Sequence, residues 1–190
     1  ERNNPIEAQA VADYIVSRLM DKKRNHLSIG VVTLNTEQQR CIEDCLETHR
    51  RNNQQLERFF HATNRYDPVF VKNLESVQGD ERDIIIFSLG YGPTELDANR
   101  ISMNFGPLNK QGGERRLNVA VTRSTTEMHV FSSFDSNMID LSRTSSMAVR
   151  HLKNFLEYAE RGPIALAGTA DASAEPSRVN LDLEQTIAHR

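Results

Sequence analysis

The sequence predicts a doubly wound α/β domain whose sheet is mostly parallel, and two observations support this prediction. The first is a set of short apolar runs, typical of buried strands, at residues 28–34, 69–74, 83–89 and 128–133. The second is a set of segments with apolar residues at helical spacing, at residues 5–21, 36–46, 112–123 and 149–159. Strands that alternate with helices favour parallel pairing through crossover connections.

Local signals mark where the elements begin. Asn4 is a good N-cap, Pro5 suits the first helical position, and Glu7 completes a capping box. A second capping box at residues 36–39 opens the next helix. Residues 90–114 form a long segment rich in Gly and Pro, within which 101–105 are expected to form a small strand.

Composition excludes several classes of protein. The net charge of −3 argues against an overtly basic nucleic-acid binder, so any contact with nucleic acid must be local. The chain has no apolar run long enough to span a membrane. Cys41 and Cys45 have no further metal ligands beside them, which predicts reduced thiols in a cytoplasmic protein without a metal site. Because the chain begins at Glu1 without an initiator Met, we expect it to be a piece of a longer protein.

An arginine-rich segment at residues 112–123 is the first candidate for chemistry. Arg116 and Arg123 are seven residues apart, so one continuous helix would place them about 20° apart around its axis and about 10 Å apart along it. Two guanidinium groups on one helix face are suited to a polyphosphate. Taken alone, the spacing is more often that of arginines that are solvated or paired with carboxylates.

A second constellation lies between two predicted strands, at residues 71–83. Gln78 and Gly79 form a turn with an amide side chain, and Glu81 offers a carboxylate to a ribose. An ordinary polar loop is the alternative. The chain has no G-x-x-x-x-G-K-[ST] phosphate loop and no acidic pair for Mg²⁺ after an apolar strand. We therefore expect that it does not hydrolyse a nucleotide alone.

Three segments, in order, carry a resemblance to a known family. Ile29 to Asn35, with Gln38, resembles the segment IGVITPYxxQ. Residues 75–85 resemble the family's motif V, DxFQGxExDxII, and residues 115–123 resemble its motif VI, RRLNVAxTRA. Over residues 1–134 the chain thus resembles the second RecA-like domain of superfamily 1 helicases, in the branch of the nonsense-mediated-decay helicase. It looks closest to large bacterial multidomain helicase-related proteins, which share NLExVQGDERD and a YGP…FGPLN…GG insertion.

The resemblance implies a fold and a domain organisation. The expected fold is RecA-like, a P-loop NTPase-type α/β/α sandwich of three layers that lacks its own Walker A segment and carries an added C-terminal helix. The expected units are the RecA-like domain at 1–134, a helical extension at 135–162, and a linker or peripheral segment at 163–190.

The resemblance also implies roles for individual residues. Arg123 matches the arginine finger of motif VI and is the expected catalytic residue, with Arg116 as a structural or secondary phosphate contact. Glu81 matches the glutamate that holds the ribose of ATP, and Gln78 and Gly79 match the turn that links nucleotide and nucleic acid. The expected nucleic-acid contacts are Thr33, Asn35, Asn73 and Ser76. The chain departs from the family in having Ser124, Thr125 and Thr126 after the finger.

The function implied is that of the C-terminal motor domain of an ATP-dependent helicase or translocase. ATP and Mg²⁺ are its cofactors, with the Mg²⁺ ligands in an N-terminal RecA-like domain of the same polypeptide. Its other partner is single-stranded nucleic acid, DNA rather than RNA, with no membrane partner. Two alternatives stay open at this point: a degenerate helicase half that serves as a non-catalytic interaction platform, and an unrelated nucleotide-binding α/β module.

Overall fold

A parallel sheet organises the chain. The computed structural model describes residues 3–62, 67–93 and 100–166. Within them one sheet has the strand order β2-β1-β3-β4. Its strands are β1 (Ile29–Thr33), β2 (Phe70–Asn73), β3 (Arg82–Ser88) and β4 (Ser124–Phe131). All three neighbouring pairs are parallel. The predicted RecA-like α/β class is confirmed.

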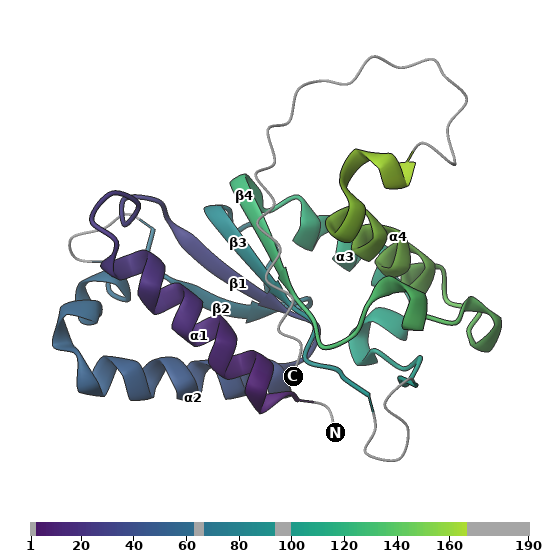
Figure 1. Ribbon diagram of the computed structural model, residues 1–190, viewed down its shortest axis with the longest axis horizontal. Helices are drawn as coiled ribbons and strands as arrows, with labels where there is room; N and C mark the ends of the chain where they lie inside the picture. Colours follow the sequence, from purple (N-terminus) through teal and green to yellow (C-terminus); the bar gives the residue numbers. More distant parts are fainter. Residues whose placement is uncertain (1–2, 63–66, 94–99, 167–190) are drawn as a thin grey trace.

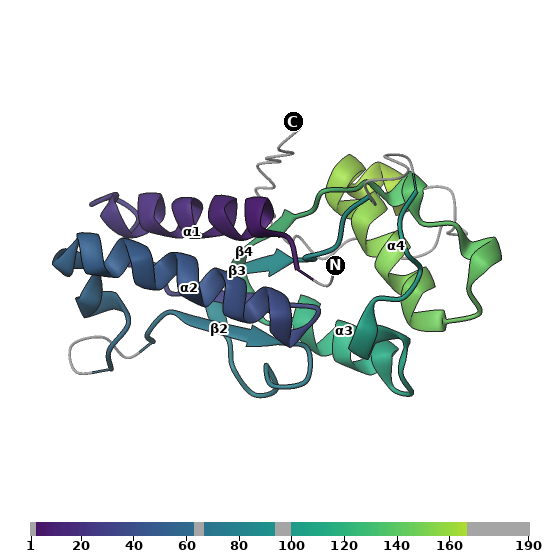
Figure 2. The same cartoon turned by 90° about the horizontal axis from the view of Figure 1, so that it is seen from below.

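Helices cover both faces of the sheet, which gives three layers (Figure 1). On one face lie α1 (Pro5–Met20) and α2 (Thr36–Asn52), side by side in Figure 2. On the other face lie α3 (Gly113–Val121) and α4 (Met147–Arg161). Short 3-10 turns occupy Gln54–Phe59, Gly106–Asn109, Ser136–Met138, Leu141–Arg143 and Gly162–Leu166.

Alternate residues of each central strand face opposite layers. Ile84 and Ile86 of β3 lie in the core beneath α1 and α2, whereas Ile85 and Phe87 lie in the core beneath α3 and α4. All four are fully buried. A parallel sheet covered on both faces needs apolar residues at every position, which explains why its strands read as continuous apolar runs.

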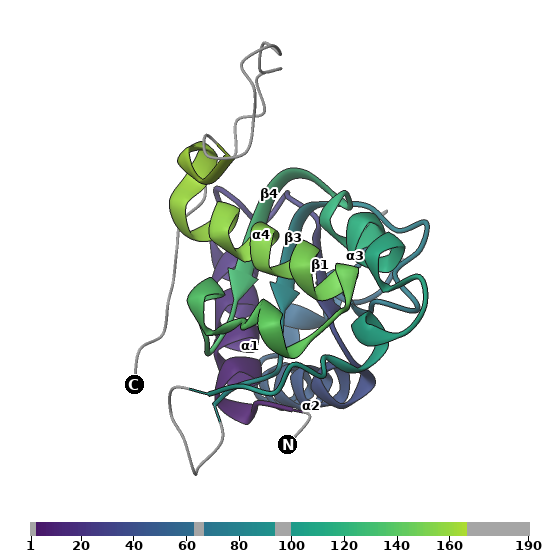
Figure 3. The same cartoon turned by 90° about the vertical axis from the view of Figure 1, so that its right-hand side faces the viewer.

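The C-terminal helix α4 is part of this second core. Val149, Leu152 and Leu156 are buried with residues of the sheet, and the rings of Phe155 and Phe87 meet edge to face at 5.6 Å. Figure 3 shows α4 lying across the sheet beside α3. The boundary that we predict at residue 134 stays a prediction, and residues 167–190 lie outside the described part of the chain.

Three predicted details of the elements are wrong. The N-cap of α2 is Asn35, whose Oδ1 accepts a hydrogen bond from the backbone N–H of Gln38 at 2.8 Å, and the helix continues to Asn52. Residues 101–105 form no strand. They alternate between buried and exposed because this extended segment packs onto the second core, where the rings of Tyr91 and Phe105 meet at 5.3 Å. Finally, α3 ends at Val121, and β4 begins already at Ser124.

None of the helices in the described ranges is both long enough and apolar enough to cross a bilayer.

The start of α3 depends on a glycine. A Cβ atom added to Gly113 would lie 1.8 Å from the carbonyl oxygen of Leu108, a backbone atom that cannot turn aside. We expect Gly113→Ala to lower the free energy of unfolding by about 1–3 kcal/mol, as overpacking does elsewhere. Urea unfolding measures this change. The control is Asn118→Ala, at an exposed position of the same helix. Equal midpoints for the two variants would contradict the packing described here.

Candidate functional site

The pairing of β3 with β4 brings Glu81 and Arg123 together. The backbone N–H of Arg82 donates to the carbonyl of Arg123 at 3.1 Å, and Arg82 stands opposite Ser124 in the parallel register. Glu81, which precedes β3, therefore lies beside Arg123, which precedes β4. Nη1 of Arg123 is 3.4 Å from Oε1 of Glu81, whose side chain is 58% exposed. A cation and an accessible carboxylate thus share the amino-terminal edge of the sheet.

Arg123 is also fixed by the end of α3. Its Nε donates to the carbonyl of Val119 at 2.9 Å, and its Nη2 donates to Oγ1 of Thr122 at 3.2 Å. Carbonyls at the end of a helix carry partial negative charge, which favours a cation there. The Arg123 side chain is only 19% exposed. Its guanidinium is held against the protein, with Nη1 directed to Glu81.

Arg116 lies at the other end of α3. Its Nη1 donates to the carbonyls of Gln111 at 3.0 Å and Pro107 at 3.4 Å, in the segment that precedes the helix. Side chains on a helix tilt toward its amino terminus, which directs Arg116 away from Arg123. The prediction of two guanidinium groups on one helix face is therefore wrong, because α3 ends before Arg123.

Gln78 and Gly79 form an exposed turn between β2 and β3. Gly79 has a φ of 89°, in the left-handed region that favours glycine, although a Cβ there would meet no atom within 4 Å. Beside the turn, Nζ of Lys72 binds Oδ2 of Asp80 at 2.6 Å. Because β2 and β3 are both parallel to β1, this connection runs from the carboxyl edge of the sheet to its amino edge.

The four expected nucleic-acid residues lie at the carboxyl ends of β1 and β2. Thr33 and Asn35 are buried, and the Thr33 hydroxyl donates to the Asn35 carbonyl at 2.7 Å. Asn73 is partly exposed, and its Nδ2 donates to Oε1 of Gln39 at 2.9 Å. Ser76 is exposed, and its hydroxyl accepts from the Asn73 N–H at 3.1 Å. The structure therefore places these four residues at the opposite edge from Glu81 and Arg123.

Glu7 is a chemically distinctive residue that sequence reasoning reads only as part of a helix cap. Its side chain is buried, and Oε1 accepts hydrogen bonds from the Ser88 hydroxyl at 2.6 Å and from the Gly90 N–H at 2.8 Å. Oε2 has no hydrogen-bond partner among the described residues. Burial raises the pKa of Glu7 to about 7, and hydrogen bonds from the Ser88 side chain and from the backbone of Gly90 and Leu89 only partly oppose the rise.

The glutamine of the second helix completes this buried cluster. Oε1 of Gln38 accepts from the Asn4 N–H at 2.8 Å, and its Nε2 donates to the Ser88 hydroxyl at 3.1 Å. The cluster joins the first turns of α1 and α2 to the end of β3. The only sequence signal at this place is the capping pattern of Asn4 and Glu7, which does not reveal that Glu7 is buried.

Within the described ranges, no group of three or more His, Cys, Asp or Glu side chains is arranged to hold a metal ion. Cys41 and Cys45 are both free thiols, and burial raises the pKa of each.

Comparisons with known proteins match most of the chain. A family model described as an AAA domain matches residues 1–135. The chain is 40% identical over 136 residues to the uncharacterized ATP-dependent helicase MG140 of Mycoplasma genitalium. It is 39% identical, again over 136 residues, to the MG140 homolog of Mycoplasma pneumoniae. Each match covers 70% of this chain and 11% of the relative, so the chain spans about a tenth of the length of these proteins.

The raised pKa of Glu7 predicts a pH dependence of stability. Between pH 4.5 and about 7 the folded chain keeps a proton on Glu7 that the unfolded chain releases. The free energy of unfolding therefore falls as the pH rises through this window, by about 3 kcal/mol in total. Glu7→Gln removes this loss, so its stability relative to the unchanged chain should rise between pH 4.5 and 7.

Urea unfolding at a series of pH values measures the difference. Glu114→Gln, the same chemical change in the first turn of α3, is the control. Parallel pH profiles for Glu7→Gln and the unchanged chain would show that the pKa of Glu7 is the same in the folded and the unfolded chain, which would contradict the raised pKa.

Proposed function

The chain belongs to the AAA domain family, and from this membership we propose that it is the C-terminal motor domain of a superfamily 1 helicase or translocase. It is a helicase-like domain, and both relatives are named ATP-dependent helicases. The observation that carries the proposal is the position of Arg123 beside Glu81, on the amino-terminal edge of the sheet.

This pair is suited to a nucleotide bound by another domain. The chain lacks a phosphate loop, so an N-terminal RecA-like domain of the same polypeptide holds the ATP phosphates and supplies the Mg²⁺ ligands. Mg²⁺ supplies positive charge to the phosphate oxygens. Arg123 keeps the hydrogen bond from its Nε to the Val119 carbonyl. Its Nη1 leaves Glu81 and contacts the nucleotide instead. The exposed Glu81 carboxylate is then able to accept hydrogen bonds from the ribose hydroxyls.

An arginine that reaches the site from a second domain stabilises the transferred phosphoryl group only when the domains close. Arginine fingers of this kind raise the rate on the order of 10³–10⁵-fold. Closure therefore links hydrolysis to a domain movement. In this proposal Gln78 and Gly79 transmit the movement, because their connection joins the two edges of the sheet.

Single-stranded nucleic acid, DNA rather than RNA, lies along the carboxyl edge in this proposal. Asn73 and Ser76 are accessible there and contact the phosphate backbone, without reading the bases. Thr33 and Asn35 are buried, so they act by holding the strand end and the start of α2 in place.

One observation favours the alternative, a non-catalytic interaction platform. All three nitrogens of the Arg123 guanidinium have partners within the chain, as expected of a purely structural arginine. The next experiment separates the two functions.

In the full-length protein, Arg123→Ala should reduce nucleic-acid-stimulated ATP hydrolysis by about 10³-fold or more, because the transferred phosphoryl group loses its stabilising cation. A steady-state phosphate-release assay measures this, and circular dichroism tests whether the fold is kept. Arg150→Ala, at an exposed position of α4, is the control. Turnover close to that of the unchanged protein in Arg123→Ala would favour the platform.

The isolated chain should bind ATP weakly and should not hydrolyse it, because it lacks the loop that holds the phosphates. Phosphate release is measured at increasing concentrations of the chain, with and without single-stranded DNA. Turnover that grows in proportion to the chain, and that Arg123→Ala abolishes, would contradict a shared site.

A further inference from the structure

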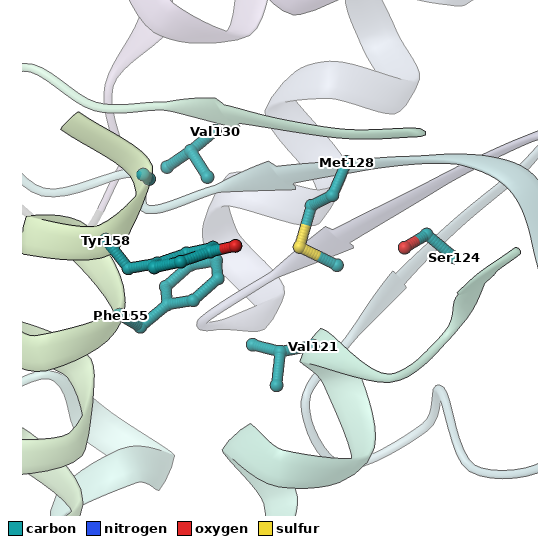
Figure 4. A pocket seen from close by; sticks show the side chains of 7 residues that line it. Val121, Ser124, Met128, Val130, Phe155 and Tyr158 are labelled. Atoms are coloured by element: carbon teal, nitrogen blue, oxygen red, sulfur yellow. The ribbon is translucent and has the colours of Figure 1, made fainter. Parts of the chain in front are cut away.

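An apolar groove lies between the edge strand β4 and helix α4, beside the end of α3 (Figure 4). Met128 and Val130 line it from β4, Phe155 and Tyr158 from α4, and Val121 from α3. Its volume is about 220 Å³. In the close-up, these side chains point toward one another across the groove.

The chemistry of the groove excludes phosphates and nucleotides as occupants. Among the described residues that line it none is charged, and the hydroxyls of Ser124 and Tyr158 are their polar side-chain groups. The volume is below the range of about 300–1,000 Å³ that is typical of small-molecule sites. A groove of this kind fits an apolar anchor side chain from a protein surface.

The wall of the groove includes the residue that directly follows Arg123 in the sequence. Val121 and Ser124 lie in its wall, and these residues enclose the Thr122–Arg123 step between α3 and β4. The Cα atoms of Arg123 and Ser124 are about 3.8 Å apart, as in any trans peptide, so a partner surface that covers Arg123 comes close to the wall of the groove. β4 is the outer strand of the described sheet, so no further described strand covers this side.

On the opposite face of β4, polar side chains contact helix α1. Glu127 and His129 point toward α1, where Nη2 of Arg18 binds Oε2 of Glu127 at 2.6 Å and the Tyr14 hydroxyl lies 2.9 Å from Nε2 of His129. The groove described above lies on the face of β4 toward α4.

We propose that this groove receives an apolar side chain of the ATP-binding N-terminal domain when the two domains close. The inference rests on the proposed function, because that domain is the partner that Arg123 must face. An anchor seated between β4 and α4 presses against Val121 and Ser124, and so holds Arg123 toward the nucleotide. The contact stabilises the closed state and leaves the binding of ATP to the open state unchanged.

The test fills the groove from α4. In the full-length protein, Ala159→Trp places a large side chain where the anchor would sit, and Met147→Trp adds the same bulk at an exposed position of the same helix. We expect Ala159→Trp to lower nucleic-acid-stimulated kcat on the order of tenfold, the effect of losing one good anchor contact. The Kd of ATP without nucleic acid should stay within about twofold, since ATP binds to the other domain.

A smaller substitution guards against misfolding. Ala159→Leu fills less of the groove and should give an intermediate kcat, and it decides the matter if Ala159→Trp unfolds. Unchanged kcat in the folded Ala159 variants would overturn the proposal. So would self-association of the full-length protein that these variants abolish without changing kcat, because that result would assign the groove to a second copy.

The same series separates the two proposals. Inactive Arg123→Ala together with fully active Ala159→Trp would refute the groove contact alone. Full activity of Arg123→Ala would refute the shared ATP site itself.

Discussion

The parallel pairing of the first residues of β3 and β4 is the constraint on which the site depends. One backbone hydrogen bond, from Arg82 to the carbonyl of Arg123, sets Glu81 beside a residue far away in the sequence. From Ile84 to Ser88 the strand β3 pairs with β4 in one register, and an irregularity between Arg82 and Ile84 sets the Arg82–Ser124 pair one residue out of that register. The position of the candidate finger therefore depends on this irregular first pair of the two strands and on the hydrogen bond from Arg123 to the end of α3.

Much of the fold could be predicted from sequence, because the strands are covered on both faces and read as uninterrupted apolar runs. The end of α3 could not. Leu117 and Ala120 keep the helical period, and no Gly or Pro follows them to stop the helix. The helix ends because Ser124 pairs with β3, a contact between distant parts of the chain. Residues 101–105 alternate between buried and exposed side chains, as a strand would. Here the alternation comes from packing onto the second core, a contact that the local sequence does not reveal.

The candidate site divides in the same way. Motif resemblance predicts Glu81 and Arg123 individually, but their ion pair depends on the strand register and could not be predicted from either motif. For Glu7 the local role could be predicted from sequence, but its chemical environment could not. A capping role explains it locally, whereas its burial and raised pKa come from the end of β3, where Ser88 and Gly90 enclose it. Glu81 and Arg123 lie at the amino-terminal edge of the sheet, and the expected nucleic-acid residues lie at its carboxyl edge. The connection that contains Gln78 and Gly79 runs from one edge to the other.

The proposed function requires that Arg123 exchanges Glu81 for a nucleotide held by another domain. Its most direct test is a structure of the full-length protein with ADP, aluminium fluoride and a single-stranded oligonucleotide. We expect the Nε of Arg123 to stay on the Val119 carbonyl while its Nη atoms leave Glu81 and contact the fluoride. An Arg123 that remains paired with Glu81 while the nucleotide site is filled and closed would contradict it.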